Sequence, residues 1–208
     1  PLVCAGSGLA LGLPANFGIE PSGAAATLPA VAGFRAIVSG SCSEATNAQV
    51  AHFRQAGGAA RQIDPLTLAA GPDDALVDGI SGWAREQWAA APDRPVLVYS
   101  TAPPPAVAAA QAQGDGHDLG ARLEAILAAV ARKLVENGAR RLVVAGGETS
   151  GACVQALGVS RLRIGAQIDP GVPWCHAAPA LAADGMHLAL KSGNFGGVDF
   201  FSRAFTLP

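Results

Sequence analysis

Two adjacent glycines followed by an acid and two hydroxyl side chains form the stretch of the chain best suited to chemistry. Gly146 and Gly147 come directly after an apolar, β-branched run. The residues after them, Glu148, Thr149 and Ser150, open the next apolar segment, so the pattern predicts a strand, a tight turn and a helix start. Glycine permits close backbone approach to a ligand, and helix N-termini attract anions. The stretch suits phosphate binding, although a strand-to-helix turn that binds nothing explains it equally well.

Similar Gly/Ser-rich turns recur at the ends of other predicted strands. They lie at residues 6–8, 40–41 and 192–196, and another predicted strand ends at Ser100-Thr101. The carboxyl ends of parallel strands share one edge of a sheet, which is where open α/β folds bind ligands. The expected cluster is rich in backbone donors and hydroxyls and poor in acids and bases, which suits holding phosphates better than nucleophilic catalysis.

Three polar or charged residues in or beside these turns, Glu148, Ser41 and Lys191, each have a functional and a purely structural interpretation. Glu148 could contact a ribose or Mg²⁺, or it could simply favour the positive end of a helix. Ser41 and Glu44 have the spacing of a capping box, so Ser41 is as well explained by helix capping as by ligand contact. Lys191, at a predicted strand end, is expected to be a solvated lysine rather than a phosphate ligand.

Hydrophobic periodicity places these turns between alternating strands and helices. Strands are expected at residues 2–5, 34–39, 61–64, 95–100, 142–144, 162–168 and 186–190, and helices at 41–57, 73–91, 118–137, 150–157 and 199–205. The pattern predicts an α/β fold: a three-layer domain with a mostly parallel, mixed sheet and Gly/Ser-rich strand-to-helix turns on one edge. Residues 14–33, rich in Pro, Gly, Ala and Ser, are expected to form a loop or hinge.

Composition excludes several classes of partner. The net charge of −2 with 14 Lys and Arg residues gives no basic surface for nucleic acid or an anionic membrane. No apolar run approaches the roughly 18 residues of a membrane span. The four cysteines are widely separated without metal-ligand spacing, so we expect free thiols, no bound metal among the protein side chains, and a cytoplasmic location.

Five segments together resemble the four-carbon acid sugar kinases, most closely their 3-oxo-tetronate kinase branch. The segments are AGSGLA (5–10), VSGSCSEATNAQV (38–50), AGGETSGACVQALGV (145–159), IDPGVPW (168–174) and LALKSGNFGGVDFF (188–201). They extend over nearly the whole chain. Enzymes of this family have an N-terminal domain that holds the sugar acid and a C-terminal domain that binds ATP. The chain, residues 1–208, resembles the C-terminal nucleotide-binding domain.

This resemblance implies a site, a reaction and partners. The reaction would transfer the γ-phosphate of ATP, with Mg²⁺, to 3-oxo-tetronate, giving 3-oxo-tetronate 4-phosphate. Its partners would be ATP or ADP, the sugar acid, and a second copy of the chain in a homodimer. By motif, the nucleotide contacts would be Ser7, Ser100, Gly146, Gly147, Glu148, Thr149, Gly193 and Asn194.

The catalytic residues are expected outside this chain. The N-terminal domain of the family carries an Asp-Asp-x-Thr-Gly motif, whereas Asp73-Asp74 here continues as Ala-Leu. The fragment alone would then bind nucleotide without turnover. The alternative is a nucleotide-binding or sensing module without chemistry. A nicotinamide dehydrogenase is disfavoured, because no Gly-x-Gly-x-x-Gly follows a strand with an acid about 20 residues later.

Overall fold

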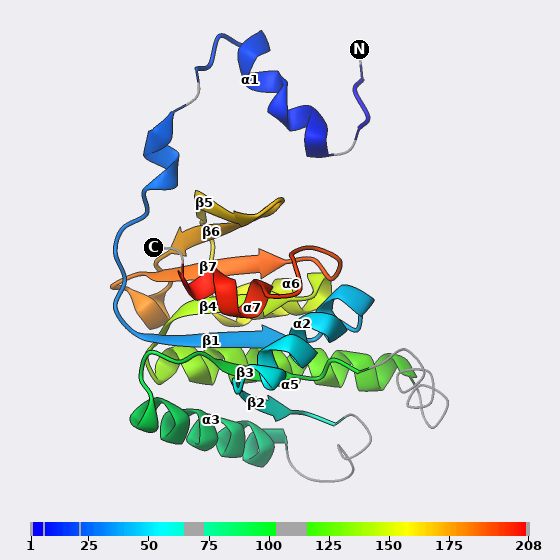
Figure 1. Ribbon diagram of the computed structural model, residues 1–208, viewed down its shortest axis with the longest axis vertical. Helices are drawn as coiled ribbons and strands as arrows, with labels where there is room; N and C mark the ends of the chain where they lie inside the picture. Colours follow the sequence, from blue (N-terminus) through cyan, green and yellow to red (C-terminus); the bar gives the residue numbers. More distant parts are fainter. Residues whose placement is uncertain (1, 6, 21, 65–72, 103–115, 207–208) are drawn as a thin grey trace.

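The domain is built on one mixed seven-stranded sheet with the order β2-β3-β1-β4-β7-β6-β5 (Figure 1). The computed structural model describes residues 2–5, 7–20, 22–64, 73–102 and 116–206. The strands are β1 (Phe34–Ser39), β2 (Ala59–Gln62), β3 (Val96–Tyr99), β4 (Ala139–Ala145), β5 (Arg163–Asp169), β6 (Val172–Ala177) and β7 (Met186–Lys191). β2, β3, β1, β4 and β7 run parallel, so their carboxyl ends share one edge, whereas β6 and β5 continue the sheet antiparallel.

Helices cover both faces of this sheet. The α-helices are α1 (Leu13–Asn16), α2 (Glu44–Gln55), α3 (Asp73–Ala90), α5 (Gly116–Glu136), α6 (Gly147–Ala156) and α7 (Phe200–Arg203). Short 3₁₀ turns are η1 (Ser7–Leu11), η2 (Gly23–Ala26), η4 (Ala180–Ala182) and η5 (Ala204–Thr206). None of the described helices combines the length and the apolar character needed to cross a membrane.

The sheet separates two hydrophobic cores. Side chains of successive strand residues point to opposite faces, so in β1 Ala36 and Val38 join the core under α3, α5 and α6. Ile37, between them, joins the core formed with Phe53 of α2 and Phe200 of α7. The predicted three-layer α/β fold with a mostly parallel, mixed sheet is therefore confirmed.

The N-terminal segment departs from the prediction. Residues 2–5 were expected to form a buried strand, yet they form no strand and are exposed, with Leu2 99% exposed. A strand requires a neighbour to pair with, and α1 with the chain around it lies beyond the β5 end of the sheet (Figure 1). Further along, Leu28 packs on Gly165, and His187 bonds the Pro29 carbonyl at 2.9 Å, so this connecting chain is docked on the sheet before β1 begins.

Three element boundaries also differ. β6 is missing from the predicted strands, because residues 170–173 resemble a turn in the sequence, whereas Pro170 and Gly171 alone form the turn and Val172 already begins the strand. The predicted capping box of Ser41 is wrong: α2 starts at Glu44, and the hydroxyl of Ser43 accepts from the Thr46 N–H at 3.2 Å. α6 starts at residue 147 rather than 150, because the turn occupies a single residue before it.

Trp88 offers a test of the core between α3 and the sheet. Its indole is 1% exposed, stacks on Phe34 with ring centroids 4.7 Å apart, and donates to the Arg35 carbonyl at 3.2 Å. Trp83, on the same helix, is only partly buried. We expect Trp88→Ala to lower the free energy of unfolding by about 3–5 kcal/mol, measured by urea denaturation and circular dichroism. Trp83→Ala is the matched control with a smaller loss, and equal losses would contradict this packing.

Candidate functional site

The hydrogen-bond ladder of the parallel strands continues past the strand ends into the Gly/Ser turns. The N–H groups of Gly40 and Ser41 both donate to the Ala145 carbonyl, at 3.0 and 3.2 Å. The N–H of Gly146 donates in turn to the carbonyl of Lys191, at 2.9 Å. The turns that follow β1, β4 and β7 are thus tied to one another at the carboxyl edge of the sheet.

Ser41 lies between the other two turns. A Cβ placed on Gly146 would be 3.2 Å from the Ser41 nitrogen. A Cβ placed on Gly193 would be 2.6 Å from Ser41 Oγ and 3.1 Å from Ser43 Oγ. A side chain at either position would therefore require the neighbouring residues to shift. Gly146 additionally has a backbone φ of 127°, a conformation that residues other than glycine rarely adopt.

Unused backbone donors gather at these turns. Gly146 is the N-cap of α6 and provides no side-chain cap, so the first N–H groups of this helix lack an intrahelical partner. Within the described part of the chain, the N–H groups of Gly147, Glu148, Thr149, Gly193 and Asn194 donate to no protein acceptor. Gly147, Glu148 and Asn194 are exposed. Free N–H groups beside a helix N-terminus are suited to binding an anion such as phosphate.

Polar side chains of α2 and of its N-cap residue, Ser43, hold the Gly193 turn in place. Ser43 Oγ and Thr46 Oγ1 donate to the Gly193 carbonyl at 2.7 and 2.9 Å. Farther along the helix, Gln49 Nε2 donates to three successive carbonyls, those of residues 195–197, at 2.9–3.1 Å. Asn47 Nδ2 reaches the Ala102 carbonyl at 3.2 Å and so connects α2 to the turn after β3 as well. One amphipathic helix therefore supports two of the turns.

The side chain of Lys191 is buried where Thr46 of α2 meets the Gly193 turn. Its side chain is 0% exposed, which contradicts the expectation of a solvated lysine. The ammonium donates to Thr46 Oγ1 at 3.0 Å and to the carbonyls of Ser192 and Gly193 at 3.1 and 2.9 Å. Burial lowers the pKa of Lys191 to about 8. A positive charge thus lies directly below the turn.

Glu124 is a residue of the site that the sequence did not indicate. It projects from α5, and its Oε1 accepts a hydrogen bond from Thr149 Oγ1 at 3.0 Å. Partial burial raises the pKa of Glu124, the Thr149 hydrogen bond opposes that rise, and the charge of Glu148 adds to it. Its Oε2 is buried without a described partner. Because Glu124 lies 25 residues from Thr149 in a regular helix, no local pattern marked it.

The two remaining predicted nucleotide contacts, Ser100 and Ser7, lie in different parts of the structure. Ser100 follows β3 at the same edge, is buried, and donates its N–H to the Ser39 carbonyl at 2.9 Å. The sequence leaves open which residue of the stretch 100–105 makes the predicted nucleotide contact, and residues 103–105 lie outside the described residues. Ser7 begins η1, in the N-terminal segment beyond β5, so the structure does not bring it to the other turns (Figure 1).

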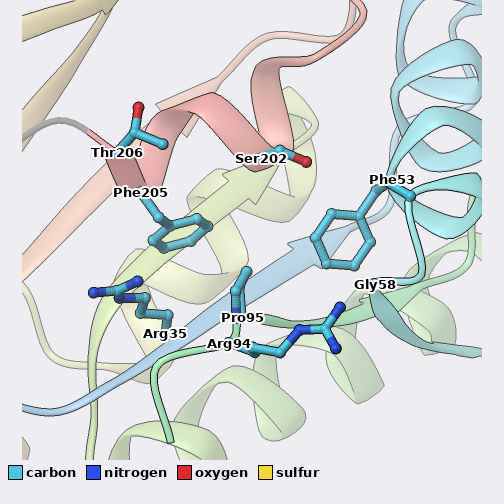
Figure 2. A pocket seen from close by; sticks show the side chains of 9 residues that line it. Arg35, Phe53, Gly58, Arg94, Pro95, Ser202, Phe205 and Thr206 are labelled. Atoms are coloured by element: carbon cyan, nitrogen blue, oxygen red, sulfur yellow. The ribbon is translucent and has the colours of Figure 1, made fainter. Parts of the chain in front are cut away.

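A cavity at the opposite edge of the sheet has a different character. It has a volume of about 180 Å³ and lies near the starts of β1, β2 and β3, where Arg35, Gly58 and Pro95 line it (Figure 2). The guanidinium groups of Arg35 and Arg94 extend in opposite directions in Figure 2 and do not converge on a ligand. This cavity is therefore separate from the cluster of turns, and the cluster is the candidate site.

Comparisons with known proteins identify the domain. Residues 36–201 match the family model of the nucleotide-binding C-terminal domain. The 3-oxo-tetronate kinases of Cupriavidus necator and Pseudomonas fluorescens are each 51% identical to the chain over 98% of its length. The chain covers only 46% of each of these relatives, so it spans about half of their length.

Solved structures agree with this match. Crystal structures of a Salmonella typhimurium protein and a Haemophilus influenzae protein both superpose with a TM-score of 0.79, at 38% and 34% identity. They cover 96% and 97% of this chain, which in turn covers 45% and 47% of theirs. The chain belongs to the family of nucleotide-binding C-terminal domains.

Proposed function

We propose that the chain is the ATP-binding half of a kinase that phosphorylates a four-carbon sugar acid, 3-oxo-tetronate, to 3-oxo-tetronate 4-phosphate. The observation that carries the proposal is the close approach of the turns at Gly146 and Gly193 to Ser41, together with the unused N–H groups of Gly147 and Gly193 in these turns. The identity of the sugar acid rests on the names of the curated relatives.

The site would act through position and charge. Transfer of a γ-phosphoryl group depends on alignment and on neutralising the phosphate oxygens rather than on covalent chemistry by the protein. The N–H groups at the start of α6 would hold phosphate oxygens, and the Lys191 charge would lie beneath them. A Cβ on Gly147 would meet no heavy atom within 4 Å, so open space for a ligand adjoins the helix start.

The described residues fit Mg²⁺ only as a partner of nucleotide phosphates. No described group of three or more His, Cys, Asp or Glu side chains could hold a metal by itself. Magnesium in kinases is held by substrate phosphates and one or two carboxylates. Glu148 and Glu124 would supply these, since their mutual repulsion favours a cation nearby. Bound Mg²⁺·ATP would supply the phosphoryl donor with its charge partly neutralised.

The acceptor and the catalytic base would come from outside this chain. Besides Glu124 and Glu148, which we assign to Mg²⁺, the described cluster offers hydroxyls, amides and Lys191, with no further carboxylate to serve as a base for the acceptor. We place the sugar acid and its base in the part of the kinase relatives that this chain does not match. We place the kinase in the cytoplasm, where ATP is available. We further propose that it forms a homodimer.

A nucleotide-binding or sensing module without catalysis is the alternative. The lack of an acid and base for the acceptor among the described residues of the cluster is consistent with this alternative too. The two functions differ in what happens when an acceptor and its domain are present: a kinase transfers phosphate, and a sensor does not.

Nucleotide titration tests the proposal directly. The 208-residue chain should bind ATP and ADP in calorimetric titrations and show no binding of NAD, because its turns suit phosphate and lack a dinucleotide fingerprint. Incubated alone with ATP and 3-oxo-tetronate, it should release no phosphorylated sugar acid. Absence of ATP binding would reject the proposed function, and robust turnover by this chain would reject the placement of the acceptor elsewhere.

Two glycines separate ligand contact from backbone strain. Gly147→Val should weaken ATP binding at least tenfold, because its side chain would fill the space assigned to phosphate, while stability falls by no more than about 1 kcal/mol. Gly151→Val is the matched control, since Gly151 lies on the same helix with equally open surroundings. Gly146→Ala should instead lower stability by about 1–3 kcal/mol, because of its positive φ.

Calorimetry and thermal melts on the three variants give the answer. If Gly147→Val and Gly151→Val bind ATP with equal affinity, phosphate does not contact the start of α6.

A further inference from the structure

The ammonium of Lys191 lacks a compensating negative charge in the described part of the chain. Its partners are one hydroxyl and two backbone carbonyls. A fully buried charge costs several kcal/mol unless it is paired or well hydrogen-bonded. Hydrogen bonds to neutral groups offset only part of that cost, so the site retains a positive charge that no carboxylate neutralises.

The charged side chains on the surrounding elements do not pair with it. They are Glu44, His52 and Arg54 on α2, Glu124 on α5, Arg140 and Arg141 on β4, Glu148 on α6, Asp169 on β5, Asp199 at the N-cap of α7 and Arg203 within that helix. None of them lies within ion-pair distance of Lys191 Nζ, and burial alone accounts for its lowered pKa of about 8. The lysine is therefore close to losing its proton at mildly alkaline pH, which an anion placed above it would prevent.

The hydrogen bonds of Lys191 also determine which way the Gly193 turn faces. Three donors, Ser43 Oγ, Thr46 Oγ1 and Lys191 Nζ, hold the Gly193 carbonyl toward the protein interior. The peptide bonds of the described chain are trans, so the C=O of Gly193 and the N–H of Asn194 point in opposite directions. The Asn194 N–H must face away from the lysine, and Asn194 is exposed.

We propose that Lys191 is a positioning residue of the nucleotide site and the buried countercharge of a bound phosphate. Lys191 orients the Gly193 turn so that the N–H groups of the turn face the ligand. When phosphate occupies the turn, its negative charge balances the positive charge of the Lys191 ammonium. This inference rests on the proposed function and adds a specific residue and a proton linkage to it.

The linkage has a definite sign. A phosphate above Lys191 stabilises the ammonium, so the pKa of this group is higher in the complex than in the free chain. Affinity is then full below a pH of about 8, the pKa in the free chain, and falls as pH rises from there to the pKa of the complex. Each unit of difference between the two values corresponds to about a tenfold change in affinity.

A pH series on the wild-type chain tests the linkage without any mutation. ADP would be titrated without metal between about pH 7.5 and 9.5, a range in which its phosphates are already ionised because their last pKa is about 6. We expect the dissociation constant to rise roughly tenfold across the range. Near pH 8, titrations in buffers of different ionisation enthalpy should show proton uptake on binding. A merely structural lysine would produce neither effect.

Lys191→Met adds an independent readout. It should weaken ADP binding at pH 7.5 by roughly 10–100-fold, the range expected for charge-assisted hydrogen bonds, and should abolish the pH dependence. Lys133→Met is the matched control, because this lysine is partly exposed on α5 and pairs with Asp78 at 3.2 Å. It should bind ADP as the wild type does.

The outcomes distinguish the two proposals. A wild-type chain that binds ADP with the same affinity across the pH range overturns the role of Lys191 and leaves the proposed function standing. Unchanged affinity of a folded Lys191→Met does the same. A wild-type chain that binds no ADP at any pH overturns both. Because the pH series uses the wild-type chain, it decides the matter even if Lys191→Met does not fold.

Discussion

The candidate site depends on the parallel pairing of β4 with β1 and β7. In this arrangement the last carbonyl of one strand accepts from the first turn residue of the next, as Ala145 does for Gly40 and Lys191 does for Gly146. The turns are therefore fixed in register with the sheet, and their positions follow from the core that orders the strands. A site made of backbone N–H groups requires this, because it has few side chains that could adjust to a ligand.

Much of this arrangement was predictable because its causes are local. The apolar run before Gly146 and the periodic helix before that run mark a strand-helix alternation, from which the parallel sheet and the shared carboxyl edge of its strands follow. Glycines that must turn sharply are visible as residue types, which is why the turns at residues 40, 146 and 193 were found. The nucleotide contacts assigned to them remain predictions that the proposed titrations test.

What could not be predicted depends on contacts between distant segments. The buried state of Lys191 arises because α2, about 145 residues earlier, covers it with Thr46. Glu124 reaches Thr149 only because α5 and α6 pack side by side. Ser43, the N-cap of α2, also donates to the Gly193 carbonyl 150 residues away, a contact that no local pattern reveals. A strand at residues 2–5 was predicted from its composition alone, but pairing partners decide whether a strand forms.

The attachment of the Gly193 turn to α2 has a consequence for the energetics of the domain. Ser43, Thr46 and Gln49 hold the turn with the same hydrogen bonds that hold the helix in place. Opening α2 would therefore release the turn, and a ligand bound to the turn must leave before the helix can open. If nucleotide binds at this turn as proposed, a higher ligand concentration would raise the local unfolding free energy of α2 by mass action. The amide protons of this helix, which contacts the ligand only through the turn, would exchange with solvent more slowly as the site fills.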